Sequence, residues 1–238
     1  EHYIDWGIIK ETRNNGDWLN NLKLGIIFDT RDFEANPMKG VWSEILFFGN
    51  PVKGLTDETF TKISITHRQY FTLKPEKLAV AIRLNYQGTI LGNTPFYMQP
   101  YMIGSFINTS NSDGLGGSKT LRGILRNRVV GDGIVMANFE GRWKFWRTHL
   151  FKQNVYWGLN AFWDTGSVVK KIDSNTNNVP TDQFNLYFNS NQEQLHHTLG
   201  GGLRFVMNEN FIVALDYGVP LDKRDGKSGL YIGLNFLF

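Results

Sequence analysis

Apolar and polar residues alternate along most of this chain with a period of two, the pattern of β-strands that have one apolar and one polar face. The clearest run is residues 78–86, where Leu, Val, Ile, Leu and Tyr alternate with Ala, Ala, Arg and Asn. No segment shows a convincing helical stripe. The pattern predicts about ten strands, at residues 4–8, 22–28, 41–49, 60–73, 78–86, 135–145, 155–163, 199–205, 211–219 and 230–238.

The connections between the predicted strands alternate between short and long. They are tight around Pro37, Pro75, Lys152 and Asn208. They are longer and rich in Gly, Asn, Asp and Ser around residues 56, 112, 177 and 225. Many of the segments approach the roughly 9–11 residues that a tilted strand needs to cross a bilayer. Short turns at one end and long loops at the other are typical of outer-membrane barrels.

The two faces of the predicted strands differ in chemistry. One face carries large aromatic residues near strand ends, and the other carries charges near strand middles. A soluble sandwich or barrel would point its apolar face inward. Aromatic girdles outside and a shared polar interior instead favour an all-β, antiparallel transmembrane β-barrel. The aromatic residues that carry this argument are Trp143, Phe145, Trp157 and Trp163.

Composition agrees with this interpretation and excludes other classes. The 238 residues fit one barrel domain, residues 1–238, and the scattered net charge of +3 gives no basic tract for nucleic acid. The chain has no cysteine and no apolar run long enough for a membrane helix. We expect residue 1 to follow a removed signal or a removed larger region. The mean hydropathy of −0.30 is compatible with a barrel, because its lumen and loops are polar.

A long glycine-rich loop between the fifth and sixth predicted strands has an unusual composition. Residues 116–124 read Gly-Gly-Ser-Lys-Thr-Leu-Arg-Gly-Ile, so Arg122 is bracketed by apolar groups and glycines. We expect the loop to fold back into the lumen, where Arg122 meets the carboxylates of Glu140 and Asp164. Both lie on the polar faces of the strands that follow the loop. The alternative is a surface loop with a solvated arginine.

Motifs of soluble catalysis are not found. Residues 114–120 lack the order of a phosphate-binding loop and precede no helix. His196 and His197 are adjacent in an extended segment, so they point to opposite faces and cannot chelate one metal together. We therefore expect no enzymatic activity, no cofactor and no metal site.

Five short motifs stand in order along the chain. They are Asp29-Thr30-Arg31-Asp32 with Pro37 and Gly40, Leu121-Arg122-Gly123-Ile124, Asn138-Phe139-Glu140, Phe162-Trp163-Asp164-Thr165-Gly166 and Leu215-Asp216-Tyr217-Gly218-Val219-Pro220-Leu221. They resemble the motifs of the Omp85 superfamily, which includes BamA- and TamA-like proteins and the surface antigen D15 barrel. The last strand also has the terminal aromatic pattern of outer-membrane barrels, in Tyr231, Gly233, Phe236 and Phe238. Ile124 departs from the aromatic residue usual at that position.

The resemblance implies a contact between Arg122-Gly123 of the loop and Glu140, Phe162 and Asp164 of the barrel. Independently of this resemblance, the terminal aromatic pattern is the one by which outer-membrane barrels are recognised for insertion, and we expect it to provide a lipid-facing apolar row. The family's barrel has about sixteen strands behind periplasmic POTRA repeats. This chain matches only the last ten or so and contains nothing that looks like a POTRA domain, so it is part of a larger barrel or a shortened relative.

The function implied by the resemblance is assembly, insertion or translocation of other proteins at the bacterial outer membrane, with both termini periplasmic. The implied mechanism uses the weakly paired seam between first and last strands as a lateral gate. Expected partners are outer-membrane lipid or lipopolysaccharide, other outer-membrane or periplasmic proteins and, as one option, a second copy of the chain. Two alternatives remain open: a membrane anchor for a fused or partner domain, and a passive pore.

Overall fold

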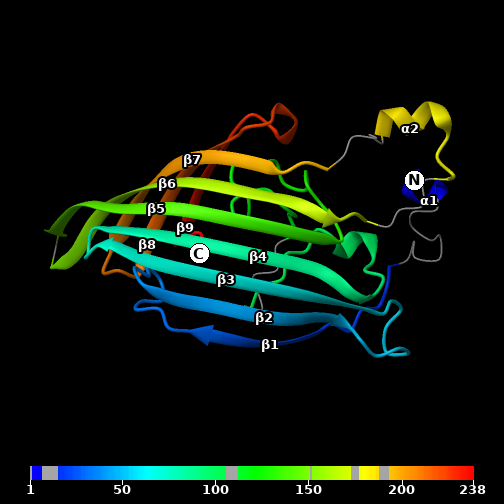
Figure 1. Ribbon diagram of the computed structural model, residues 1–238, viewed down its shortest axis with the longest axis horizontal. Coiled ribbons are helices and arrows are strands. Elements are labelled where there is room, and N and C mark those ends of the chain that lie inside the picture. The colour runs from blue at the N-terminus through cyan, green and yellow to red at the C-terminus, as the bar shows by residue number, and fades with distance from the viewer. Residues whose placement is uncertain (1, 7–15, 106–111, 151, 173–176, 188–192) are drawn as a thin grey trace.

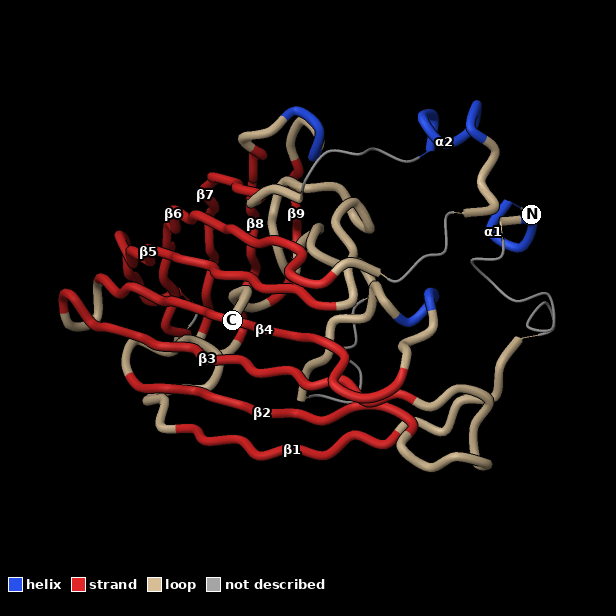
Figure 2. Tube along the Cα trace, turned by 45° about the vertical axis from the view of Figure 1, so that its right-hand side comes forward, coloured by secondary structure: helices blue, strands red, loops and turns tan. Residues whose placement is uncertain are grey.

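The computed structural model describes residues 2–6, 16–105, 112–150, 152–172, 177–187 and 193–238 (Figure 1). Within these ranges, nine strands form one antiparallel sheet in which each strand pairs with its neighbours in sequence. The sheet curves around a shared interior (Figures 1 and 2). The strands are β1 (Leu22–Asp29), β2 (Gly40–Asn50), β3 (Phe60–Lys74), β4 (Leu78–Gly92), β5 (Gly133–Leu150), β6 (Gln153–Lys170), β7 (His196–Met207), β8 (Phe211–Pro220) and β9 (Gly229–Leu234).

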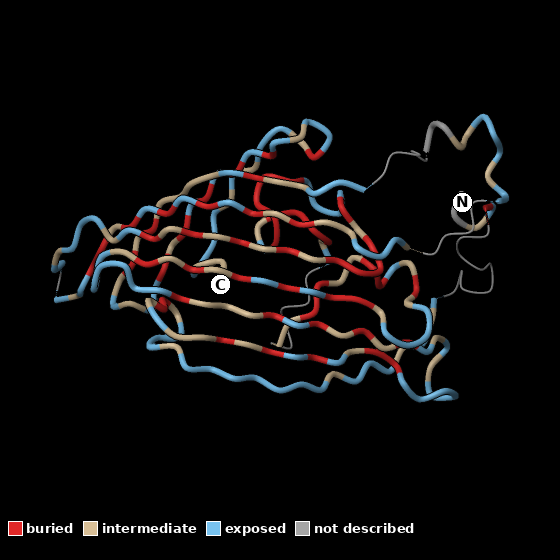
Figure 3. The backbone as a smooth tube through the Cα atoms, viewed as in Figure 1, coloured by how far each residue is buried: buried red, intermediate tan, exposed pale blue. Residues whose placement is uncertain are grey.

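The alternation predicted from the sequence is confirmed along β4. Ala81, Arg83 and Asn85 are buried in the interior, whereas Leu84 and Tyr86 are exposed on the outer face. Antiparallel pairing carries this division across the sheet, since residues opposite each other point to the same side. Arg83 thus lies opposite Asn138 of β5, and Asn138 lies opposite Asp164 of β6. Buried and exposed residues alternate along the central strands, which leaves charges inside and large apolar groups outside (Figure 3).

The predicted first strand, residues 4–8, is wrong in its described part. A short helix, α1 (His2–Asp5), occupies it, and residues 7 and 8 lie outside the described residues. A run of five residues is too short for alternation to distinguish a strand from a helical turn. The described sheet therefore has nine strands rather than about ten, and the long loop separates β4 from β5.

Helical structure is a minor part of the described chain. It comprises α1, α2 (Thr181–Tyr187) and two short 3₁₀ segments, η2 (Phe96–Met98) and η3 (Lys223–Asp225). None of the helices in the described ranges is long and apolar enough to cross a membrane.

The sheet has two free edges in the described structure. β1 pairs only with β2, and β9 pairs only with β8. β9 is six residues long, against 18 residues for each of the central strands β5 and β6. The last strand therefore has far fewer ladder hydrogen bonds to hold it than the middle of the sheet.

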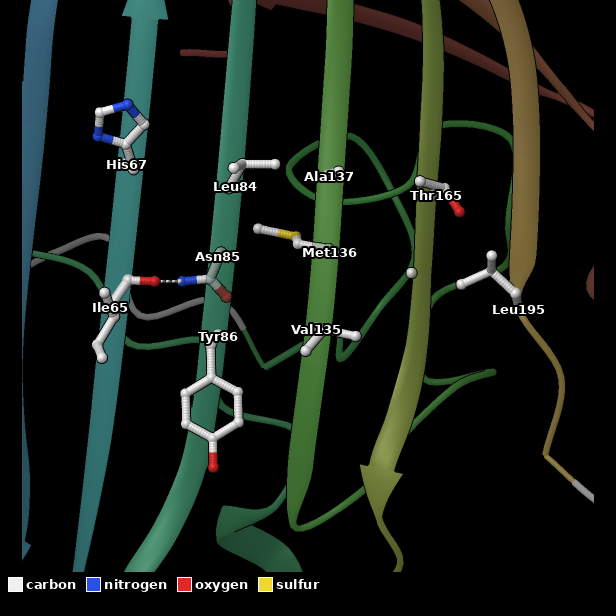
Figure 4. A pocket seen from close by; sticks show the side chains of 11 residues that line it. Ile65, His67, Leu84, Asn85, Tyr86, Val135, Met136, Ala137, Thr165 and Leu195 are labelled. Atoms are coloured by element: carbon white, nitrogen blue, oxygen red, sulfur yellow. Dashed lines mark hydrogen bonds between the residues drawn. The ribbon is translucent and has the colours of Figure 1, made fainter.

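The outer face carries a groove of about 440 Å³ over β3–β6 (Figure 4). Ala137 lies opposite Leu84 on one side and Thr165 on the other, so its small side chain leaves a hollow between larger neighbours. The groove faces away from the interior, because Leu84 and Tyr86 on its wall belong to the exposed set. It is separate from the charged site described below.

Candidate functional site

The loop between β4 and β5 lies in the interior and is held by its own apolar core. Leu121 and Ile124 are buried in it together with Leu115 and Val129 of the loop and Met136 of β5. Ile124, the residue that departs from the family pattern, is 1% exposed and belongs to this cluster. Apolar packing therefore fixes the loop on both sides of Arg122.

Thr120 organises the backbone just before Arg122. Its hydroxyl accepts a hydrogen bond from the Gly116 amide (2.7 Å) and lies 2.8 Å from the Gly116 carbonyl oxygen. The Thr120 carbonyl in turn accepts from Asn138 of β5 (2.8 Å). These bonds give the Gly116 amide and carbonyl and the Thr120 carbonyl partners inside the protein, so their burial strands none of them.

Arg122 is fully buried and binds two carboxylates. Its Nε and Nη2 each donate to Asp164 at 2.9 Å, one to each oxygen, and its backbone amide donates to the same side chain at 3.1 Å. Nη1 donates to Glu140 Oε1 at 2.5 Å. The planar guanidinium satisfies this bidentate geometry, which a lysine ammonium cannot reproduce.

An aromatic ring forms the floor beneath the guanidinium. The Arg122 Cζ atom lies 3.5 Å from the centroid of the Phe162 ring. Phe162 fits there because β7 has a glycine opposite it: a Cβ on Gly200 would lie 2.2 Å from Phe162 Cζ. The sheet thus positions Phe162 to shield one face of the arginine from water, which strengthens the cation–π attraction.

The charged cluster extends beyond Arg122. Glu140 also accepts from Arg142 Nε (2.9 Å), and Asp216 of β8 pairs with Arg204 of β7 (2.9 Å). Asp216 Oδ2 lies 3.6 Å from Arg122 Nη1, so the two pairs meet at the loop arginine. Three arginines and three carboxylates balance in charge. A balanced, hydrogen-bonded cluster avoids the cost of an unpaired buried charge.

Gly123 places the loop directly against the last hairpin. It has φ +103°, and a Cβ added to it would lie 2.7 Å from the Gly218 carbonyl carbon. Its amide donates to the Tyr231 hydroxyl of β9 at 2.9 Å. The loop therefore contacts β5, β6, β8 and β9 within two residues.

The residues singled out from the sequence fall into two groups. Arg122, Gly123, Glu140, Phe162 and Asp164 lie together in one site, with the distances given above. Arg142, Arg204 and Asp216 were not predicted to belong to this site, although Asp216 and Gly218 lie in one of the five motifs. The signal in the sequence was the alternation along each strand, which places Arg142, Arg204 and Asp216 on the polar face.

The four residues of the predicted C-terminal insertion signal lie in different surroundings. The Tyr231 hydroxyl accepts a hydrogen bond from Gly123 of the loop. Gly233 is exposed, and a Cβ added to it would have no heavy atom within 4 Å. Phe238 is buried against Tyr70 and Ala81, and Phe236 packs beside Tyr156. The expected place of Phe236 and Phe238 in a lipid-facing row is thus wrong, because β9 ends at Leu234 and the chain then turns inward. Leu230, Ile232 and Leu234 form the exposed row.

The histidine pair behaves as two separate residues. His196 lies between Asp225 (2.8 Å) and Glu193 (3.1 Å), whereas the ring of His197 stacks on Trp163 with centroids 5.8 Å apart. Among the described residues, no group of three or more potential ligands is arranged to hold a metal ion.

A curved antiparallel sheet with an apolar outside, a charged inside and a loop bound in that interior defines a membrane barrel protein. The chain belongs to the Omp85 superfamily, whose members are bacterial outer-membrane proteins: the model of the Omp85 superfamily domain matches residues 2–238. No curated protein sequence gives a match.

A solved structure supports the same fold. The chain is similar to a crystal structure of BamA from Haemophilus ducreyi lacking POTRA domains 1–3, with a TM-score of 0.64 and 16% sequence identity. The match covers 90% of this chain and 42% of that one. The chain therefore spans less than half of the BamA chain that it resembles.

Proposed function

We propose that this chain is a barrel region that assists the assembly, insertion or translocation of other proteins at the outer membrane. The supporting observation is the last strand: β9 is six residues long, pairs on one side only, and contacts the loop that carries Arg122 through Tyr231. An unpaired edge in lipid is costly and is a template for strand addition. A short edge strand of this kind is suited to act as a seam.

In this proposal the Arg122 site anchors the seam rather than performing chemistry. The loop bridges β5 and β6 to β8 and β9, so its position and that of the last hairpin are linked. Residues 1–238 act as one barrel domain with both termini on the periplasmic side. The partners are outer-membrane lipid or lipopolysaccharide and other outer-membrane or periplasmic proteins. A second copy of the chain is a further candidate partner.

Reconstitution tests the proposal. The purified protein in liposomes should raise the folding yield of a urea-unfolded outer-membrane barrel added from outside at least several-fold. Arg122→Ala should lose this gain, and Val80→Ala, which shortens an outer-face side chain, should keep it.

Single-channel recordings of the same preparation separate the alternatives. Steady ion conductance with no gain in client folding would replace the proposal with a passive pore. If the preparation shows no ion conductance and no gain in client folding, the protein is a membrane anchor instead.

A further inference from the structure

The last four residues leave the sheet and cross the interior. β9 ends at Leu234, and Asn235, with φ 69°, donates its amide to Ile212 O at 3.0 Å. The terminal Phe238 then packs on Tyr70 of β3 and Ala81 of β4. Both ribbon views draw the C-terminus beside β4, although β9 is the far edge strand (Figures 1 and 2).

Phe238 is held by an aromatic ring and two arginines. Its ring centroid lies 6.5 Å from that of Tyr70 and 5.1 Å from the Cζ atoms of both Arg83 and Arg142. Arg142 Nη2 also donates to the main-chain oxygen of Phe238 at 2.7 Å. The residue is therefore bound through both its side chain and its backbone.

Phe236 uses the same arginine from another side. Its ring lies 4.4 Å from Arg142 Cζ and 5.3 Å from Arg204 Cζ. It also packs against the cluster of Tyr156, Val206 and Ile212. Two aromatic residues spaced i and i+2 thus occupy one arginine-lined surface.

The arginines of this surface have unused capacity for a ligand. Arg83 donates to Asn138 Oδ1 (2.8 Å) and to Lys119 O (2.9 Å), both neutral groups. No carboxylate lies within 4.0 Å of it in the described part of the chain. Arg142 is 4% exposed, yet its Nη1 has no hydrogen-bond partner in the described structure. The negative faces of aromatic rings compensate such buried cations.

We propose that Tyr70, Arg83, Arg142 and Arg204 form an internal binding site for an aromatic–x–aromatic peptide segment, occupied by Phe236 and Phe238 as a detachable strap. The Asn235 amide still bonds to Ile212 of β8, but after it side-chain contacts and the Arg142 bond hold the strap. It joins β9 to β3 and β4 across the interior and completes a ring with β5–β8. Release of the strap would untether β9 from β3 and β4. The proposal is independent of the function proposed above.

Photocrosslinking tests the occupied site. With p-benzoylphenylalanine at position 238, irradiation in native membranes should give crosslinks to tryptic peptides 69–77 and 78–83, which contain Tyr70 and Ala81. The same probe at Leu234, an exposed outer-face position, should not label these peptides. Crosslinks of the 238 probe to lipid or lipopolysaccharide alone would overturn the assignment.

Exchange of the occupant tests the binding site. A dansylated Asn-Phe-Leu-Phe peptide, which repeats residues 235–238, should bind the Phe236→Ala/Phe238→Ala variant at least tenfold more tightly than wild type. Adding Arg83→Gln to that variant should remove the gain. A dansylated Asn-Leu-Leu-Leu peptide corrects for partition into detergent. Equal binding of both peptides, or equal binding to wild type and variant, would show that no such site exists.

Spin-label distances test the strap. The chain contains no cysteine, so labels at Leu84→Cys and Ile232→Cys report the separation of β4 and β9 without background. The Phe236→Ala/Phe238→Ala change should broaden or lengthen that distribution. Phe211→Ala, which truncates an exposed aromatic on β8, should leave it unchanged. An unchanged distribution in the double variant would remove the strapping role, whatever the protein does for its clients.

Discussion

Gly123 and Gly218 meet backbone to backbone at the centre of the site. A Cβ on Gly123 would lie 2.7 Å from the Gly218 carbonyl carbon, and a Cβ on Gly218 would lie 2.5 Å from the Arg122 carbonyl oxygen. Neither position has room for a methyl group, and the neighbouring atoms are backbone. The contact between the loop and β8 therefore requires glycine on both sides.

Gly218→Ala should push the loop away from β8 and destabilise the protein by ~1–3 kcal/mol, the usual cost of overpacking. The measurement is the urea midpoint of the purified protein, followed by tryptophan fluorescence. Gly141→Ala on β5 is the matched control, because nothing lies within 4 Å of its added Cβ. Equal midpoints for the two variants would contradict the close contact.

Arg122→Ala should destabilise the protein more than Asp164→Ala. The arginine change strands Asp164, whereas the aspartate change leaves Arg122 bound to Glu140 at 2.5 Å. Loss of one member of a buried pair costs up to ~3–5 kcal/mol, and the double variant should depart from additivity by ~0.5–3 kcal/mol.

Trypsin cleavage after Lys119 in folded protein reports loop release, alongside the urea midpoint. Arg122→Lys, which keeps the charge but loses the fork, should fall between wild type and alanine. Strict additivity of the two alanine changes would argue against direct coupling.

Residues 82 and 83 should report opposite environments. Ile82 faces outward and Arg83 is buried in the interior. An arginine at mid-bilayer on the lipid face would cost ~2–4 kcal/mol, so the register is strongly specified. Spin labels at Ile82→Cys and Arg83→Cys should differ in their accessibility to a lipid-soluble and a water-soluble relaxing agent. Equal accessibility would mean that the register is wrong.

Phe238→Ser should lower the amount of protein in the outer membrane, if the terminal aromatic pattern serves insertion. Quantitative blotting of purified outer membranes measures it, and Leu221→Ser, at an exposed position just after β8, controls for polarity alone. Unchanged levels, together with a widened distance between labels on β4 and β9, would assign Phe238 to the interior strap only.

The fold followed from the sequence because a period of two specifies both the strand and its orientation. Along residues 78–86, the longest clean alternation, the inward and outward sets were correct. It failed at residues 4–8, where the run was too short, and after Leu234. There Asn235 adopts a positive φ and turns the next residues inward. Such a local backbone change leaves the apolar pattern of Phe236 and Phe238 unaltered.

The candidate site was partly accessible to the same reasoning. Glu140 and Asp164 lie on inward positions of the strands after the loop, so their approach to Arg122 follows from register. The role of Asp216 and Arg204 depends on how far the sheet curves, which brings β7 and β8 over the loop. The alternation of apolar and polar residues within a strand carries no information on that curvature. The need for glycine at position 200 could not be predicted either, because it arises from the Phe162 ring that lies opposite it in the folded sheet.

The loop's contacts with the last hairpin determine when the site can form. Gly123 bonds to a residue 108 positions later, and Arg142 to one 96 positions later. Contacts across such long separations form late, because chain entropy must first be lost to bring the segments together. Until β8 has paired with β7, Arg204 has no Asp216 to bind, and until β9 has paired with β8, Gly123 has no Tyr231. A nascent chain that lacks the final hairpin can therefore already bind Arg122 to Glu140 and Asp164, but its loop is not yet tied to Gly218 and Tyr231.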